Sequence, residues 1–216
     1  MGRLGQERSE RTRGRLVREG AVRFDRSGYA GATLAEIASA AGVTKGALYF
    51  HFSSKEELAR AVVAHAERAL RGALGTLRAG SSPLQALIDA GYWLVAALHT
   101  DPVVRAAFRL GHEDGAWQGE GEPVAGVRGI QGVWAGAVRE LLAGARRAGE
   151  LRGRSGGTGP ESLVVAAACG LEVLGVATRD RADLHRRMEA LWEWLLPSLV
   201  PPGAVGSYRT AAPPAL

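Results

Sequence analysis

The chain has 216 residues, of which 46% are hydrophobic and 23% charged, and its formal net charge is +5 at pH 7. These proportions are those of an ordinary folded globular protein, so they exclude an intrinsically disordered chain and a protein built of membrane spans. The length allows one large domain or a small domain joined to a medium one.

The positive charge is concentrated near the N-terminus. Residues 1–60 contain 11 basic and 7 acidic side chains, a balance of +4, whereas residues 61–216 contain 16 and 15, a balance of +1. Lys45 and Lys55 are the only lysines, so most of the charge is arginine, whose guanidinium suits phosphate and base recognition. This placement favours a polyanion as the partner of the N-terminal region.

The sequence is typical of a cytoplasmic protein. Its single cysteine, Cys169, cannot form an intramolecular disulfide, which fits a reducing compartment. No apolar targeting segment follows the first residues, and the longest apolar stretch, residues 163–177, is interrupted by Glu172. That stretch is also shorter than the roughly 18 residues that a membrane span needs, so we expect no membrane association.

Apolar residues recur at helical spacing and no strand pattern occurs, which predicts an all-α fold. A first helix is expected over residues 7–27, with Leu16, Ala21 and Phe24 on one face and Gly28 as its stop. A long amphipathic helix is expected over residues 54–77, opened by the capping box of Ser54-Lys-Glu-Glu. Further helices are expected over residues 84–100, 102–110, 127–148, 161–178 and 182–199, with glycine-rich loops at 115–121 and 153–160 and a mobile, proline-rich tail at 201–216.

Between the first helix and the long one, two short helices surround a glycine turn. Thr33 begins a capping box with Glu36, because the hydroxyl and the carboxylate can satisfy free amides at the start of a helix. Gly42 supplies the turn, and Thr44 can cap a third helix over residues 45–51. The arrangement predicts a helix-turn-helix.

A helix-turn-helix reads DNA by placing its second helix in the major groove. In that reading helix Lys45 can reach a phosphate or a guanine and Gly46 permits close approach of the backbone, while Leu48 and Phe52 face the core. The candidate DNA contacts are Thr33, Thr44, Lys45, Gly46, Tyr49, His51 and Lys55. Spacing alone leaves open a tight helical corner that does not touch DNA.

Over residues 28–58 the chain resembles the signature of the TetR family of repressors. The matching stretches are Gly-Tyr at 28–29, Thr-Leu-Ala-Glu-Ile-Ala at 33–38, Ala-Gly-Val-Thr-Lys-Gly-Ala-Leu-Tyr-Phe-His-Phe at 41–52 and Ser-Lys-Glu-Glu-Leu at 54–58. The resemblance implies an all-α homodimer with three N-terminal helices as the DNA reader and about six more as a regulatory domain. Such a dimer would bind a palindromic operator with half-sites about 34–36 Å apart.

Within this family the chain resembles the γ-butyrolactone-receptor branch of antibiotic-producing actinobacteria. The resemblance lies in residues 43–52, in Asp-Pro-Val-Val-Arg-Ala at 101–106 with Arg109-Leu110, and in Trp134 ahead of Ala-Gly-Glu-Leu at 148–151. The composition, rich in alanine, glycine and arginine, agrees with a high-GC genome. The resemblance implies a repressor released by a small signalling molecule, a γ-butyrolactone, a butenolide or a related compound.

The resemblance also implies that the last two long helices pack against their copies in a partner chain. The sequence offers apolar stripes at Val164, Ala168, Leu171 and Leu174 and at Leu191, Leu195 and Leu199, each of which is as compatible with the chain's own core. Small residues over 166–170 would allow close helix approach.

In the resembled receptors a tryptophan lines the ligand pocket, and Trp134 is the matching position. We expect ligand contacts from Trp134, Trp93, Leu110, Val138 and Leu171. Where those receptors have polar pocket side chains, this chain has Ala66 and Leu171. A polar ligand would then leave groups unpaired, at about 1–3 kcal/mol each, so a pseudo-receptor that answers to an antibiotic or another hydrophobic ligand stays open.

The expected protein is therefore a cytoplasmic, ligand-responsive repressor that controls antibiotic or secondary-metabolite genes. Its expected parts are a DNA-binding domain over 1–53, a regulatory and dimerisation domain over 54–200 and the tail. No enzyme, cofactor or metal is expected, because His112, Glu113 and Asp114 are adjacent and do not share a helix face. A helical interaction module that does not bind DNA is the distant alternative.

Overall fold

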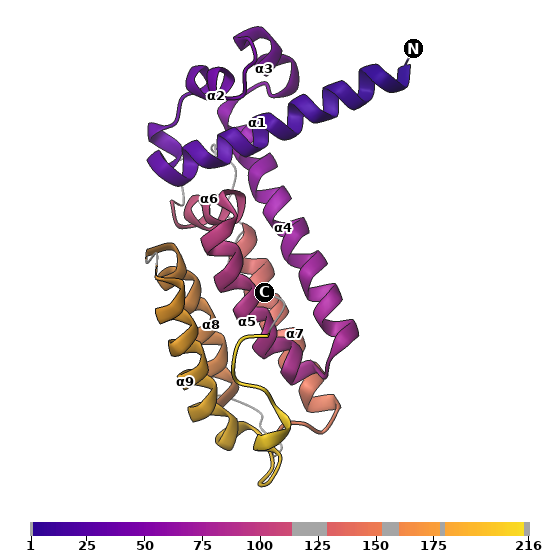
Figure 1. Ribbon diagram of the computed structural model, residues 1–216, viewed down its shortest axis with the longest axis vertical. Helices are drawn as coiled ribbons and strands as arrows, with labels where there is room; N and C mark the ends of the chain where they lie inside the picture. The colour runs from indigo at the N-terminus through magenta and orange to yellow at the C-terminus, as the bar shows by residue number, and fades with distance from the viewer. Residues whose placement is uncertain (1, 114–128, 153–159, 178–179, 214–216) are drawn as a thin grey trace, which may run out of the picture. The chain divides into compact units, whose positions relative to one another are not determined.

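The computed structural model describes residues 2–113, 129–152, 160–177 and 180–213, and over these residues all regular secondary structure is helical (Figure 1). The elements are α1 (Gly2–Gly31), α2 (Leu34–Ala40), α3 (Lys45–His51), α4 (Lys55–Gly80), α5 (Pro83–Thr100), α6 (Pro102–His112), α7 (Gly129–Arg147), α8 (Pro160–Ala177), α9 (Arg181–Leu199) and the 3-10 turn η1 (Val205–Ser207). The all-α prediction is confirmed. The loop expected at 115–121, and that at 153–160 apart from Pro160, lie outside the described residues.

The chain forms two compact units. One comprises residues 1–68 and 101–130, and the other residues 69–100 and 131–216. This division differs from the expected one at residue 53, because α6 packs with α1 and so belongs with the N-terminal helices. Helix α4 has residues in both units and is one uninterrupted helix.

Helix α1 begins at Gly2 rather than at Glu7 and contains a break at Gly28, whose φ of 70° and ψ of 179° are not helical. The early start escaped prediction because these first turns are polar and carry no apolar stripe, although arginine, glutamate and glutamine are good helix formers. Its N-terminal turns extend beyond α2 and α3 (Figure 1). After Gly28 the chain turns toward α2.

Two side chains of α6 and the residue that follows it hold the end of α1. Arg105 Nε donates to Asp25 Oδ2 at 2.9 Å, and Arg109 Nη1 donates to the main-chain oxygen of Asp25 at 2.6 Å. Glu113 follows α6 and accepts from the main-chain N–H of Tyr29 at 2.7 Å and from Arg109 Nε at 3.0 Å. These charged groups occupy free main-chain groups on both sides of the break in α1, which fixes its geometry.

In the second unit, α5 packs against α8 and α9, and α8 and α9 pack against each other (Figure 1). Helix α5 is buried on most sides, which fits its apolar sequence. Glu150 accepts from the main-chain N–H of Leu84 at 2.8 Å and so satisfies a free amide in the first turn of α5. Among the described residues no helix is both long and apolar enough to cross a membrane.

Residues 201–213, expected to be a mobile tail, make specific polar contacts with α5. Arg209 lies in an ion pair of 2.7 Å with Asp89, a carboxylate of α5 that is only 5% exposed. The main-chain N–H of Arg209 also donates to Gln85 Oε1 at 2.9 Å, and the Tyr92 hydroxyl donates to the main-chain oxygen of Thr210 at 2.5 Å. Burial beside Glu189 and Asp89 raises the pKa of Tyr92 to about 12, so the hydroxyl stays a donor. The proline-rich composition of this segment gives no indication of these hydrogen bonds and this ion pair.

Candidate functional site

The turn between α2 and α3 is fixed by local hydrogen bonds. The Thr33 hydroxyl accepts from the main-chain N–H of Glu36 at 3.3 Å, and Thr44 Oγ1 accepts from that of Ala47 at 3.1 Å. Gly42 has a φ of 63°, a left-handed conformation that glycine adopts without steric cost. The two capping residues and the turn glycine are therefore those that the sequence predicts.

The side chains of α3 divide into a buried and an exposed set. Leu48 and Phe52, the residue that caps α3, have no exposed surface and join Ile37 of α2 in the core. Thr44, Lys45, Gly46, Tyr49 and Phe50 are exposed, and His51 is half-buried. The helix thus presents its N-terminal half and one aromatic face to solvent, which is the face that a major groove would receive.

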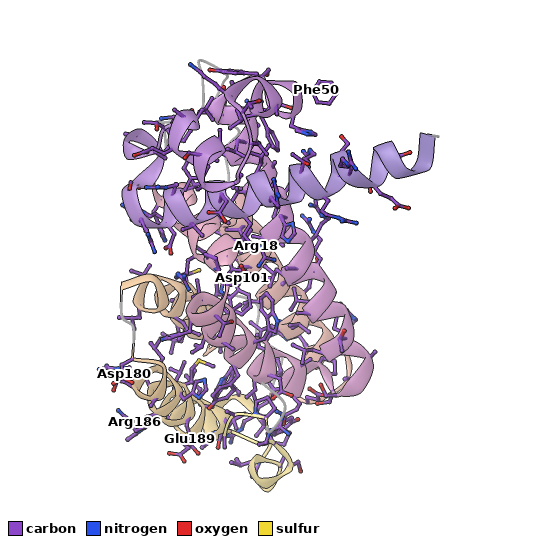
Figure 2. All side chains as sticks on the ribbon, turned by 45° about the horizontal axis from the view of Figure 1, so that its top comes forward. Arg18, Phe50, Asp101, Asp180, Arg186 and Glu189 are labelled. Carbon is purple, nitrogen blue, oxygen red and sulfur yellow. The ribbon has the colours of Figure 1, made fainter. Side chains whose placement is uncertain are left out.

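Phe50 is the residue of this face that the sequence analysis missed. Its side chain is 81% exposed and lies at the outer side of α3 (Figure 2). Its ring meets the His51 ring edge to face, with centroids 5.2 Å apart. Helical geometry could have found it, because positions 48 and 52 face the core and position 50 lies on the opposite side. An exposed phenylalanine suits contact with a thymine methyl group.

Gly46 and Lys45 leave the start of α3 accessible. A Cβ built on Gly46 would meet only Thr44 Oγ1, at 4.0 Å, so the chain's own packing does not require glycine there. Lys45 Nζ lies 5.8 Å from the centre of the Tyr49 ring. Both features fit an external partner that comes close to the backbone and carries negative charge.

Exposed arginines of α1 add positive charge to the unit that contains α3. The exposed arginines are Arg8, Arg11, Arg13, Arg15 and Arg18, and the guanidinium carbon of Arg13 lies 4.9 Å from the centre of the Phe52 ring (Figure 2 labels Arg18). The N-terminal charge seen in the sequence therefore falls on the same unit as α3.

The second unit contains an apolar cavity between α5, α7, α8 and α9. It is lined by Leu87, Gly91, Trp134, Val164, Ala167, Ala168, Leu171, Met188, Leu191, Trp192 and Leu195. The volume of this cavity is about 20 Å³. Cavities that hold small molecules commonly have about 300–1,000 Å³, so this one is narrow and a ligand enters only if side chains move.

Of the five expected ligand contacts, the structure brings Trp134 and Leu171 to this cavity. Trp93, Leu110 and Val138 are not among its lining residues, and Leu110 belongs to the other unit. Val138 and Leu110 are fully buried, as core residues of their helices are. Ala66, expected at a polar pocket position of the receptors, is fully buried and also absent from the lining.

Comparison with known proteins agrees with this geometry. Residues 17–62 match the model of the bacterial regulatory proteins of the tetR family. The chain is 32% identical over 204 residues to the A-factor receptor protein of Streptomyces griseus, which covers 94% of this chain and 69% of that protein.

The chain belongs to the TetR family. Members are transcriptional regulators, so it is not an enzyme. Two solved structures resemble the fold. The first is a gamma-butyrolactone receptor, described as an ArpA-like protein, with a TM-score of 0.73 and 30% identity; the match covers 93% of this chain and 94% of that one. The second is the TetR family protein CprB from Streptomyces coelicolor in complex with its operator, with a TM-score of 0.74, 30% identity and the same coverages. The resemblance to the γ-butyrolactone-receptor branch is thereby confirmed.

Within the TetR-family reader, two of the expected DNA contacts make hydrogen bonds inside the chain. Lys55 Nζ donates to the main-chain oxygens of Tyr29 at 2.8 Å and Ala32 at 3.1 Å, and it lies 4.4 Å from the centre of the Tyr29 ring. The Thr33 hydroxyl donates its proton to Glu36 Oε2 at 2.9 Å. Both donors are used inside the chain, because carbonyls at a helix end and a nearby carboxylate attract them.

The start of α4 is capped as predicted. The main-chain N–H of Glu57 donates to Ser54 Oγ at 3.1 Å, and Glu57 Oε2 accepts from the main-chain N–H and the hydroxyl of Ser53 at 2.7 and 2.8 Å. These hydrogen bonds from Ser53 hold the pKa of the Glu57 carboxyl below its ordinary value. The cap fixes the junction at which α3 ends and α4 begins.

Proposed function

We propose that this TetR-family chain is a repressor that binds palindromic operator DNA through α3 and is released by a small apolar signalling molecule. The observation that carries the proposal is the exposed face of α3, to which Lys45, Gly46, Tyr49 and Phe50 contribute, with open space around Gly46. The operator-bound structure of CprB supports it. The protein would act in the bacterial cytoplasm, on genes of antibiotic or other secondary-metabolite production.

Each exposed side chain of α3 suits one kind of DNA contact. Lys45 and the Tyr49 hydroxyl can donate to phosphates, and Lys45 can also reach a guanine. Thr44 Oγ1 accepts from Ala47, which leaves its proton for a phosphate oxygen. Phe50 offers only apolar surface, so it would read a thymine methyl group and contribute sequence specificity.

Fluorescence anisotropy tests DNA binding on fragments from upstream of the protein's own gene, against shuffled fragments of equal length. We expect Phe50→Ala to weaken binding to the native fragment by roughly tenfold, since one base contact is worth about 1–3 kcal/mol, and to leave the shuffled fragment unaffected. His65→Ala, an exposed change on α4, is the matched control and should bind as the unaltered protein does. Equal affinity for native and shuffled fragments at low salt would contradict the proposal.

A homodimer is the assembly that we propose, with a second copy of the chain on α8 and α9. Four large apolar side chains are exposed on these helices: Leu163 at 61%, Val173 at 50%, Leu174 at 46% and Trp194 at 85%. Ala166 and Gly170 lie exposed on the same helix α8 and would allow close approach. The two apolar stripes expected from sequence are mostly not exposed. Val164, Leu171 and Leu199 are buried in the chain's own core, and of the stripe residues only Leu174 is exposed. Exposed apolar groups of this size favour a partner surface.

The proposed effector site is the cavity lined by Trp134 and Leu171. The name of the similar gamma-butyrolactone receptor favours a lactone as effector. The lining favours a second candidate, a pseudo-receptor for a hydrophobic ligand, because nearly all of its side chains are apolar. Both candidates share one mechanism, in which the ligand binds better to the conformation that does not fit the operator.

Helix α4 would carry the change. It is uninterrupted from Lys55 to Gly80, and its residues are divided between the unit that contains α3 and the unit that contains the cavity. A ligand that shifts α4 would change the separation of the two reading helices in a dimer. A coupling of about 1–3 kcal/mol is typical of such systems and corresponds to roughly 5–150-fold in operator affinity.

A further inference from the structure

Two tryptophans line the apolar cavity, and their indole N–H groups differ. Trp134 is 1% exposed, and its Nε1 donates to the main-chain oxygen of Ala168 at 3.0 Å. Trp192 is 3% exposed, and its Nε1 is buried with no acceptor among the described residues. Buried polar groups are nearly always hydrogen-bonded, because an unpaired donor loses its contact with water and gains nothing in return.

Within the described part of the chain, no side chain that lines the cavity with Trp192 accepts a hydrogen bond from this N–H. The other large lining side chains are Leu87, Val164, Leu171, Met188, Leu191 and Leu195, none of which has a strong acceptor. The indole N–H of Trp134 is already used. Among the described lining residues, Trp192 is thus the one with an unsatisfied buried donor, and the other side chains around the cavity are apolar; ligand sites commonly fix orientation with few polar groups of this kind.

The narrowness of the cavity also has an identifiable cause. A Cβ built on Gly91 would lie 2.4 Å from Met188 Cε, so the end of the Met188 side chain fills the space that glycine leaves open. Both residues line the cavity, together with Trp192 four positions beyond Met188 on α9. Methionine has three rotatable bonds and adapts to irregular space, so it can withdraw at low cost.

We propose that Trp192 is the polar anchor of the effector site. Its indole N–H donates a hydrogen bond to a single carbonyl oxygen of an otherwise apolar ligand, and the ligand occupies the space that Met188 fills in this structure. Trp134 contributes its ring as an apolar wall and keeps its N–H on Ala168. The inference deepens the proposed ligand response and rests on it. A compound with one exposed acceptor and an alkyl chain fits this site, whereas a compound with several hydrogen-bonding groups would leave those groups unpaired.

The test uses full-length protein labelled with ¹⁵N in its five tryptophans, whose indole signals are assigned with single Trp→Phe variants. Two probes of similar shape are compared: γ-decalactone, which has a carbonyl acceptor, and hexylcyclopentane, which has none. We expect γ-decalactone to move the Trp192 indole proton signal downfield and hexylcyclopentane to leave it near its original position. This readout uses the unaltered chain and so does not depend on the folding of a variant.

Affinity provides the second readout. Trp192→Phe, which keeps an aromatic ring and removes the donor, should weaken γ-decalactone binding by roughly three- to tenfold, the loss expected for one hydrogen bond, and leave hexylcyclopentane binding unchanged. Trp93→Phe is the matched control and should leave γ-decalactone affinity within about twofold, since Trp93 does not line the cavity. An unmoved Trp192 signal on saturation, full affinity in Trp192→Phe, or no binding of γ-decalactone up to its solubility limit would each overturn the inference.

Operator binding by the same samples separates this inference from the proposed function. If specific DNA binding persists while Trp192 proves uninvolved, only the assignment of the anchor is wrong. If no fragment is bound specifically, the proposed function is wrong whatever the indole signals do.

Discussion

Replacing Gly28 by alanine should destabilise the N-terminal unit by about 3–5 kcal/mol, from two separate causes. The φ of 70° and ψ of 179° lie in a region that is essentially restricted to glycine, which costs another residue about 1–3 kcal/mol. A Cβ at this position would also lie 2.5 Å from Glu113 Oε1. Glu113 would have to move and give up its 2.7 Å hydrogen bond from Tyr29, a charged bond worth about 1.5–3 kcal/mol.

Urea unfolding followed by circular dichroism measures the effect as a change in the free energy of unfolding. Gly14→Ala is the matched control, because Gly14 lies in α1 with nothing within 4 Å of its built Cβ. It should be neutral or stabilise by up to about 1 kcal/mol. The double variant Gly28→Ala with Glu113→Ala should cost less than the sum of the two single changes, since removing the carboxylate relieves the clash. A loss below about 1 kcal/mol in Gly28→Ala, or strict additivity in the double variant, would refute the reasoning.

Three further predictions concern DNA binding, the tail and assembly. If Lys45 contacts a phosphate, Lys45→Ala should lower the slope of log affinity against log salt concentration by about one and weaken binding to all DNA sequences to a similar extent. An unchanged slope would exclude that contact. Arg209→Ala should lower the free energy of unfolding by about 1–3 kcal/mol, because it leaves the buried Asp89 carboxylate without its cation. Arg186→Ala removes an exposed ion pair and should lower it by less than about 0.5 kcal/mol. Equal effects of the two changes would contradict the role given to the tail. Trp194→Glu should convert a dimer to a monomer in sedimentation velocity, and a persistent dimer would move the interface away from α9.

The parts of the fold that are encoded locally could be predicted from the sequence. Helix α3 has the predicted bounds because Thr44 caps it and Gly42 supplies the left-handed turn, and both signals lie within a few residues of the helix. The start of α4 was predicted at Ser54 for the same reason. Short-range hydrogen bonds of this kind need no knowledge of the rest of the chain.

The parts that depend on distant contacts could not be predicted. Arg105 and Asp25 are 80 positions apart, and nothing in the spacing of either indicates that α6 belongs with α1. The pairing of Arg209 with Asp89 is equally remote, and nothing in the proline-rich sequence of the tail indicates it. Periodicity reports which face of a helix is apolar, but not which helix covers it.

The candidate site shows the same contrast. The resemblance identified Trp134 as a pocket residue, and helical spacing separated the core side of α3 from its outer side. Neither could reveal that Lys55 bonds to carbonyls at the end of α1, nor that Trp192 retains an unused donor while Trp134 does not. Whether a polar side chain is already satisfied is a property of the folded structure.

The central claim is that ligand and operator compete through two conformations of one dimer, and the most direct test measures both on the same sample. A labelled upstream fragment is bound to the full-length protein at two salt concentrations, and γ-decalactone or an extract of the producing organism is added while anisotropy is recorded. The account predicts specific binding that weakens with salt and a further loss of roughly 5–150-fold when ligand is present. A ligand that demonstrably saturates the cavity and leaves operator affinity unchanged would contradict it.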